Sequence, residues 1–368
     1  MTRASPPLSI LVIAACPFPA GRGSQLLIER TSQSLLERGH RVELLTSRFG
    51  EEGRRDPFPV RRAGLPRGRR PIDSRPSLRR ALDDALIAIR ALGSRPDVLL
   101  GHNVEGGVIA GLAGRWLRRP AVYLRHSLFA DERALASDWP RVARAAYGVP
   151  ERWAETLASR IVVLAPDGQA PPRVARPVDW VPPPVDPHER PIDPADGLTL
   201  YYEGNRDAYQ NPSWLDAALR ASRRRCPGAR LGLAPSPRAR PARADLALVP
   251  RSLRGGFPMK LLAHQVSGIP ALCTESGAPG LVDGTDAFIL RGPATRDRFA
   301  AAACGLLGQP ERLRALRETA RARALKRSDP ARSGELLERS LRRAAHGGGD
   351  GPSVYSAAHS TRSPPPPW

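Results

Sequence analysis

The sequence is poor in several residue types, and each shortage removes a class of protein. Aromatic residues make up 5% of the 368-residue chain, which has no aromatic RNP pattern, heptad repeat or zinc-ligand spacing. No apolar run approaches the roughly 20 residues that a membrane-spanning helix requires. The four cysteines, Cys16, Cys226, Cys273 and Cys304, are scattered without metal-site spacing. We therefore expect free thiols in a reducing cytoplasm, without a zinc site, an RNA-reading module or a transmembrane segment.

The apolar start of the chain also needs an interpretation. Residues 8–16, LSILVIAAC, follow no basic segment, and the PFPAGRGS after them is not a small-residue cleavage site. This pattern predicts a buried first strand rather than a signal peptide. Apolar residues make up 41% of the chain, and its length suits two domains that each bury a core.

Charge is strongly unbalanced. The chain has 57 Lys and Arg residues against 36 Asp and Glu, a formal net charge of +21. Such a chain can attract nucleic acid or an anionic membrane surface, although a compositional bias toward Arg, Ala, Pro and Gly explains the excess equally simply. Because the arginines are spread over most predicted helices, we favour compositional bias with some peripheral attraction to the inner membrane face over a dedicated nucleic-acid role.

In the first half, apolar runs alternate with amphipathic segments. The predicted strands are 8–16, 40–47, 97–103, 121–127 and 161–165, and the predicted helices include 25–38, 76–93 and 107–118. Residues 48–75 are basic and rich in Pro and Gly, and we expect a loop there. Nearly continuous apolar strands separated by helices are typical of a parallel sheet covered on both faces.

Composition divides the chain further. Residues 167–197 are rich in Pro and predict an interdomain linker between a first domain over 1–166 and a second over 198–345. In the second domain the predicted strands are 198–204, 229–235, 244–250 and 269–275, with a helix over 213–224 and three helical segments between 295 and 345. The glycine- and proline-rich end, 346–368, predicts disorder. The fold class is therefore α/β, with two Rossmann-like domains facing across a cleft.

Ligands of such sheets bind beyond the carboxyl ends of the strands. After the first strand, Gly21 and Gly23 permit a tight turn, and Ser24 can cap a helix whose N-terminus would suit a phosphate. An ordinary strand–helix turn would read the same way. His126 follows the fourth strand, and a lone histidine is more often structural. It gains interest because His102 and Glu105 follow the preceding strand and would line the same rim.

Lysine is rare, and its position is therefore informative. Lys260 is one of two lysines, and it opens a short predicted helix after the Gly/Pro loop RGGFPM. A cation in a first helical turn opposes the helix dipole unless an anion binds there. After the first strand of this domain, Gly204 permits close approach, and Asn205, Arg206 and Gln210 supply hydrogen-bond donors.

In order, these segments resemble the family-4 glycosyltransferases, which are retaining enzymes of the GT-B fold. The resemblance covers about residues 8–330. It lies in the opening strand, glycine turn and RGHRV segment, in DVLLGHNVEGG, in AVYLRHSL, in WVPPPVD, in LYYEGNRDAYQN and in PRSLRGGFPMK. At the positions of two glutamates that mark the family, this chain has Gly255 and Ala263. The family's diphosphate-binding Arg–Lys pair aligns with Asn205 and Gln210. The stretch 236–244 is too short for the helix and strand that relatives place there.

The resemblance implies transfer of a sugar from a UDP- or GDP-linked donor to a glycan, lipid-linked or small-molecule acceptor, without a further cofactor or obligatory metal. It implies that His126 is the catalytic cleft histidine. The residues implied to bind the donor are Gly23, Ser24, Asn205, Arg206, Gln210, Phe257, Met259 and Lys260. Because both glutamates are missing, a catalytically degenerate binding or partner protein remains the alternative.

Overall fold

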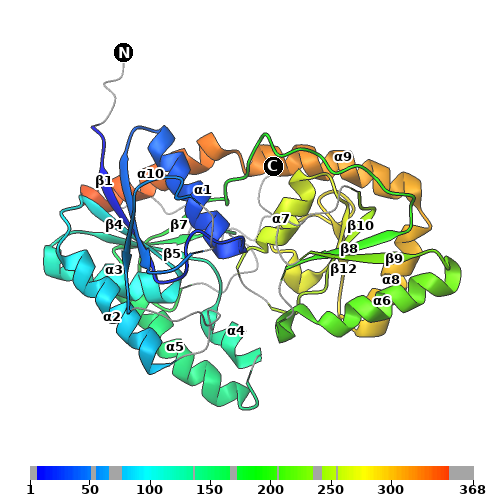
Figure 1. Cartoon of the computed structure of the whole chain (residues 1–368), viewed down its shortest axis with the longest axis horizontal. Helices are drawn as coiled ribbons and strands as arrows, with labels where there is room; N and C mark the ends of the chain where they lie inside the picture. The colour runs from blue at the N-terminus through cyan, green and yellow to red at the C-terminus, as the bar shows by residue number, and fades with distance from the viewer. Residues whose placement is uncertain are drawn as a thin grey trace.

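The chain folds around two parallel sheets, seen side by side in Figure 1 of the computed structural model. The structure describes residues 6–50, 55–65, 77–135, 137–165, 172–204, 207–234, 243–253 and 256–347. The first sheet has the strand order β3-β2-β1-β4-β5-β6-β7. Its strands are β1 (Ser9–Ala14), β2 (Arg41–Ser47), β3 (Val60–Ala63), β4 (Val98–His102), β5 (Ala121–Arg125), β6 (Arg160–Val163) and β7 (Val178–Trp180).

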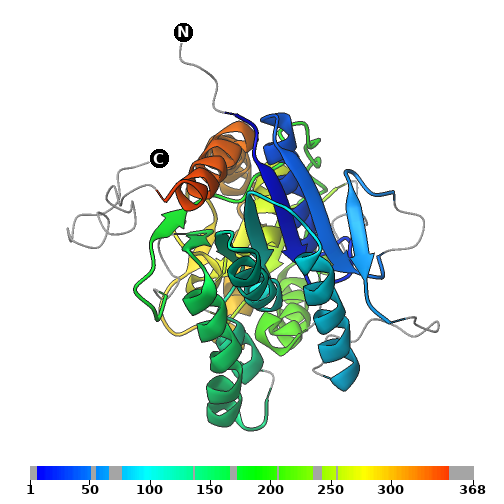
Figure 2. The same cartoon turned by 90° about the vertical axis from the view of Figure 1, so that its left-hand side faces the viewer.

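Alternation along β1 explains how helices cover both faces of this sheet. Ile10 and Val12 point into a core shared with α1 (Gly23–Glu37) and α10 (Pro330–Ala345). Leu11 and Ile13 point to the opposite core, shared with α2 (Leu78–Leu92) and α3 (Asn103–Leu117). Helix α5 (Pro140–Leu157) packs beside α3, and the short α4 (Phe129–Leu135) precedes it. In Figure 2, α2, α3 and α5 lie on the face opposite α1 and α10.

The second sheet has the order β12-β11-β10-β8-β9. Its strands are β8 (Thr199–Glu203), β9 (Arg230–Ala234), β10 (Leu246–Val249), β11 (Ala271–Thr274) and β12 (Phe288–Leu290). Helices α6 (Pro212–Arg225), α8 (Arg296–Leu307) and α9 (Pro310–Arg327) cover one face, and α7 (Met259–Val266) covers the other. Within the described residues, the paired strands of both sheets all run parallel, as expected from the nearly continuous apolar strands.

Three local predictions differ from the structure. The segment 48–75 contains the edge strand β3, whose register pairs Leu44 with Val60. The Pro-rich segment 167–197 contains β7, which adds to the first sheet through Val178 opposite Ile161. Both strands are too short and too mixed in composition to be identified from hydrophobic periodicity.

The third difference concerns the last helix, which the sequence assigns to the second domain. Leu337 and Leu341 of α10 are buried in the core of the first sheet. Figure 1 shows the chain crossing back from α9 so that α10 packs on the first domain. The crossing is supported by a hydrogen bond from the Val185 N–H to the Ser328 carbonyl, 3.0 Å long. The apolar stripe of a helix does not show which domain the helix packs against, so the sequence alone did not place α10 on the first domain. The residues predicted to be disordered after Gly347 lie outside the described ranges.

Candidate active site

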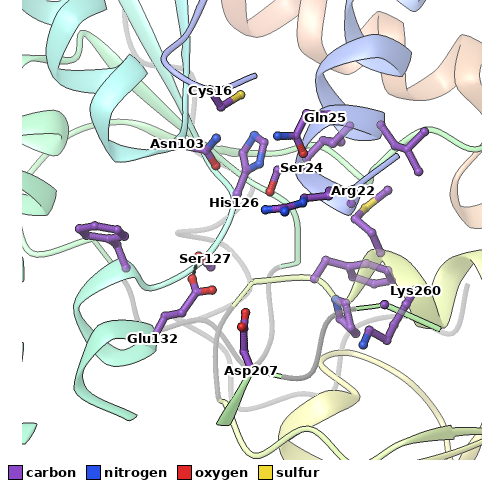
Figure 3. A pocket seen from close by; sticks show the side chains of 18 of the residues that line it. Cys16, Arg22, Ser24, Gln25, Asn103, His126, Ser127, Glu132, Asp207 and Lys260 are labelled. Atoms are coloured by element: carbon purple, nitrogen blue, oxygen red, sulfur yellow. Dashed lines mark hydrogen bonds between the residues drawn. The ribbon is translucent and has the colours of Figure 1, made fainter. Parts of the chain in front are cut away.

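A cleft of about 960 Å³ separates the two domains at the carboxyl ends of their strands. Of the nine predicted site residues, seven lie in its lining: Gly23, Ser24 and His126 from the first domain and Gln210, Phe257, Met259 and Lys260 from the second. Asn205 and Arg206 lie outside the described residues. Figure 3 shows His126 and Lys260 approaching the cleft from opposite domains. Tertiary structure thus gathers residues that are far apart in the sequence.

The glycine turn after β1 forms one wall. Residues 21–27 line the cleft, and helix α1 begins at Gly23. The helix is capped by Arg22, without a side-chain hydrogen bond, so the prediction that Ser24 caps it is wrong. Ser24 instead lies in the first turn. A β-carbon at Gly23 would lie 3.1 Å from the Met259 Cβ, which places the glycine turn against the start of α7.

A pair of buried histidines stands at the ends of β4 and β5. His102 Nδ1 and His126 Nε2 are 2.9 Å apart, so one ring donates a hydrogen bond to the other. His102 is fully buried and does not reach the cleft, contrary to its predicted place on the rim. It supports His126 from behind. Burial lowers the pKa of His126 to about 3, so its ring is neutral at physiological pH. Within the described residues, His126 Nδ1 has no hydrogen-bond partner.

Glu105, the third residue predicted for that rim, does line the cleft. Its carboxylate is 2.7 Å from the guanidinium of Arg80 at the start of α2. Burial, with the nearby Glu105 charge, raises the pKa of Asp84 to about 7. This end of the cleft, between α2 and α3, is therefore lined by titratable groups that the sequence reading had not singled out, apart from Glu105. Among the described residues no group of three or more His, Cys, Asp and Glu side chains is arranged to hold a metal ion.

Lys260 stands in the first turn of α7, as predicted, and its ammonium group has specific neighbours. It donates hydrogen bonds to Gln210 Oε1 at 3.0 Å and to the Tyr202 hydroxyl at 3.2 Å. It also lies 4.5 Å from the centre of the Tyr202 ring. Gly204 has φ +109°, a backbone conformation that favours glycine, and a β-carbon there would lie 3.1 Å from Lys260 Nζ. Burial, together with the charge of Arg251, lowers the pKa of Lys260 to about 7.

Two further charged groups of the second domain were missed by sequence reasoning. Arg251 follows β10, lines the cleft, is 8% exposed and lies 5.7 Å from the ring of Tyr209. Glu203 ends β8, and burial raises its pKa to about 7 despite the nearby Lys260. Both stand where a parallel strand ends, which is the signal that could have found them. Ala263, at one of the two glutamate positions, also lines the cleft, whereas Gly255 is outside the described residues.

With this geometry in view, comparison with known proteins is informative. Residues 21–189 match the model of Glycosyltransferase Family 4. This family 4 match covers the glycine turn, the histidine pair and most of the first sheet, and it stops short of the second domain. No curated protein sequence matches the chain significantly.

Solved structures extend the likeness beyond the family 4 match to almost the whole chain. Sucrose-phosphate synthase from Thermosynechococcus elongatus is similar with a TM-score of 0.70 and 16% identity, covering 92% of this chain and 99% of that one. Anabaena HepE in complex with UDP and glucose has a TM-score of 0.66 and 14% identity, covering 91% and 99%. WaaG, a glycosyltransferase involved in lipopolysaccharide biosynthesis, has a TM-score of 0.63 and 17% sequence identity, covering 90% of this chain and 99% of that one. The fold is therefore GT-B, as the sequence predicted.

Proposed function

We propose that this protein is a retaining glycosyltransferase that moves a sugar from a UDP- or GDP-linked donor to an acceptor in the cleft. The observation that carries the proposal is the Lys260 ammonium group, held by Gln210 and Tyr202 at the start of α7 and facing the glycine turn across the cleft. A partly desolvated cation at a helix N-terminus suits a diphosphate leaving group, whose charge increases as the sugar departs.

The donor diphosphate would lie between α7 and the end of β10. The main-chain N–H groups of Phe257 and Met259 and the cations of Lys260 and Arg251 would hold it, while Pro258 has no N–H to donate. Gln210, in η1 (Ala208–Gln210), takes the place of a family cation. Because its Oε1 accepts a hydrogen bond from Lys260, its role would be to orient the ammonium group.

Neutral His126 would contact the sugar from the first domain. Its Nε2 is engaged with His102, and its Nδ1 is buried without a partner among the described residues, so the ring would turn toward the cleft for Nδ1 to accept a hydrogen bond from a sugar hydroxyl or donate one to it. A ring with a pKa of about 3 stays neutral, so it would position the sugar without adding charge. HepE has been solved in complex with UDP and with UDP-glucose, which supports a nucleotide-sugar donor for this chain.

The proposal is tested by donor binding followed by turnover. Thermal unfolding is measured with UDP-, GDP- and ADP-sugars, and release of the nucleoside diphosphate is then followed with candidate acceptors. We expect the sugar donors of one nucleotide base to raise the melting temperature of the protein. His126→Ala should keep most of that stabilisation and lower turnover roughly 10²-fold, because it removes a sugar contact and leaves the diphosphate site intact. Absence of stabilisation by every donor would overturn the proposal.

Donor affinity should also depend on pH. The pKa of Lys260 and that of Glu203 are both about 7. Above that pH, Lys260 loses its positive charge and must take up a proton to bind a diphosphate, while Glu203 gains a negative charge. Both changes weaken binding, so the Kd of UDP-glucose should rise roughly tenfold between pH 6 and 8.

Isothermal titration in buffers of different ionisation enthalpy checks this prediction, since proton uptake on binding should accompany it. Lys260→Met should flatten the pH dependence. A Kd that is constant or falls with rising pH would contradict the protonation of Lys260 in the complex.

A further inference from the structure

Three neighbouring helices of the first domain expose large apolar side chains. Trp116 of α3 is 75% exposed, and Trp153 of α5 is 58% exposed. Trp139, immediately before α5, is 73% exposed. The other large apolar side chains exposed on these helices are Leu78, Leu82, Ile89, Leu92, Leu112, Val142 and Val149. Helix α3 packs between α2 and α5 (Figure 2), and we call the outer surface of the three helices the α2–α3–α5 face.

The exposed charged residues of the three helices are all arginines, whereas Asp138, beside Trp139 and just before α5, is an exposed acid. The exposed arginines are Arg79, Arg90, Arg115, Arg141, Arg144 and Arg152. Every acidic residue of the three helices is instead buried or half-buried. Glu155 is paired with Arg125, Glu105 with Arg80, and Glu151 accepts the Phe129 N–H. The outer surface of the three helices therefore combines tryptophan, aliphatic and arginine side chains, and the exposed carboxylate beside it is that of Asp138.

This pattern does not follow from the composition of the chain. Helix α9 is richer in arginine than α2, α3 or α5, yet its leucines Leu313 and Leu316 are buried. On its solvent side, Glu311 and Glu318 are exposed beside the arginines. An arginine-rich helix of this protein can thus have an ordinary mixed surface. The α2–α3–α5 face departs from it in both apolar exposure and charge.

We propose that the α2–α3–α5 face binds the surface of an anionic lipid bilayer. Tryptophan seats itself at the boundary between headgroups and acyl chains, and arginine pairs with lipid phosphates while its stem covers apolar surface. None of the described helices is long and apolar enough to cross a membrane, so this contact lies on the surface. A second copy of the chain would bring six exposed arginines against six others, with Asp138 the exposed acid beside Trp139 on each copy, and this excess of like charge disfavours self-association.

The face adjoins the cleft at the first turn of α2. Leu78 is 80% exposed on the outer surface, while Arg80, two residues later, lines the cleft. A protein bound through this face would therefore present the first-domain end of its cleft close to the lipid. Binding itself does not depend on the transferase activity, so it is measured on the chain without donor.

The test compares two double substitutions with the same change of charge. Co-sedimentation is measured with vesicles of equal parts phosphatidylcholine and phosphatidylglycerol, and with phosphatidylcholine alone. Arg115→Glu with Arg152→Glu should lower binding to the anionic vesicles by at least about tenfold. Arg314→Glu with Arg339→Glu, on the exposed sides of α9 and α10, should lower it by less than about threefold, because those sites lie away from the bound surface.

A second variant tests the apolar contribution. Trp116→Ala with Trp153→Ala should weaken binding by at least about tenfold, and brominated lipid should quench the fluorescence of the unsubstituted chain. Equal loss from both arginine pairs would overturn the proposal, since it would reflect net charge alone. Absence of vesicle binding would also overturn it. So would a dimer in lipid-free solution that the Trp substitutions dissociate, because the face would then serve a second copy.

Discussion

Replacing Lys260 by methionine should lower kcat/KM for the donor by roughly 10²- to 10³-fold, or about 3–4 kcal/mol of transition-state stabilisation. Methionine keeps most of the length of the side chain and removes the ammonium group that lies 3.0 Å from Gln210 Oε1. The loss should be larger in kcat/KM than in ground-state binding of the donor, because charge on the departing diphosphate is greatest in the transition state. Steady-state kinetics and titration calorimetry separate the two.

The chain provides a matched control. Lys326, the other lysine, is exposed near the C-terminal end of α9. Lys326→Met makes the same chemical change without approaching the cleft, so its kinetics should equal those of the unsubstituted chain. A folded Lys260→Met variant with unchanged kinetics would show that α7 does not hold the diphosphate.

Gly256→Ala should be strongly destabilising, because it combines a backbone collision with a positive φ. Gly256 has φ +70°, and an added β-carbon would lie 2.4 Å from the His126 carbonyl oxygen and 2.9 Å from the Ser127 Cα. These are backbone atoms of the turn that carries the cleft histidine, so they cannot rotate aside. We expect the free energy of unfolding to fall by about 3 kcal/mol or more, and the loop before α7 to withdraw from His126. Denaturant unfolding and donor affinity measure both effects.

Gly280 separates backbone strain from collision. Its φ of +67° is nearly the same, but a β-carbon there would meet nothing within 4 Å. Gly280→Ala should therefore lower the free energy of unfolding by only about 1 kcal/mol and leave donor affinity unchanged. If the two alanine variants were equally stable, the contact between Gly256 and the turn after β5 would not be tight in solution.

The resemblance of the sequence to one family correctly indicated the fold and most of the cleft. Apolar strands in parallel order, glycine turns and strand-end polar residues depend on local chemistry, so Gly23, His126 and Lys260 could be selected without coordinates. Arg251 and Glu203 stand at equivalent strand ends, but neither is a rare residue type in this chain. Arginine in particular is too common for one position to be distinguished from the rest. His102 was placed on the rim because sequence shows that a residue ends a strand but not which way its side chain turns.

Sequence by itself determined the α/β class, the two sheets and the cation at the start of α7, because periodicity, glycine and charge act over a few residues. Only tertiary structure decided that α10 returns to the first domain, that β3 and β7 complete its sheet, and that Gly256 touches His126. It also turned the acids of α2, α3 and α5 inward and left Trp116, Trp153 and most of the arginines of these helices outside. The physical reason is that the sequence of an amphipathic helix shows which of its faces is apolar. Which element packs against that face depends on how the whole chain packs.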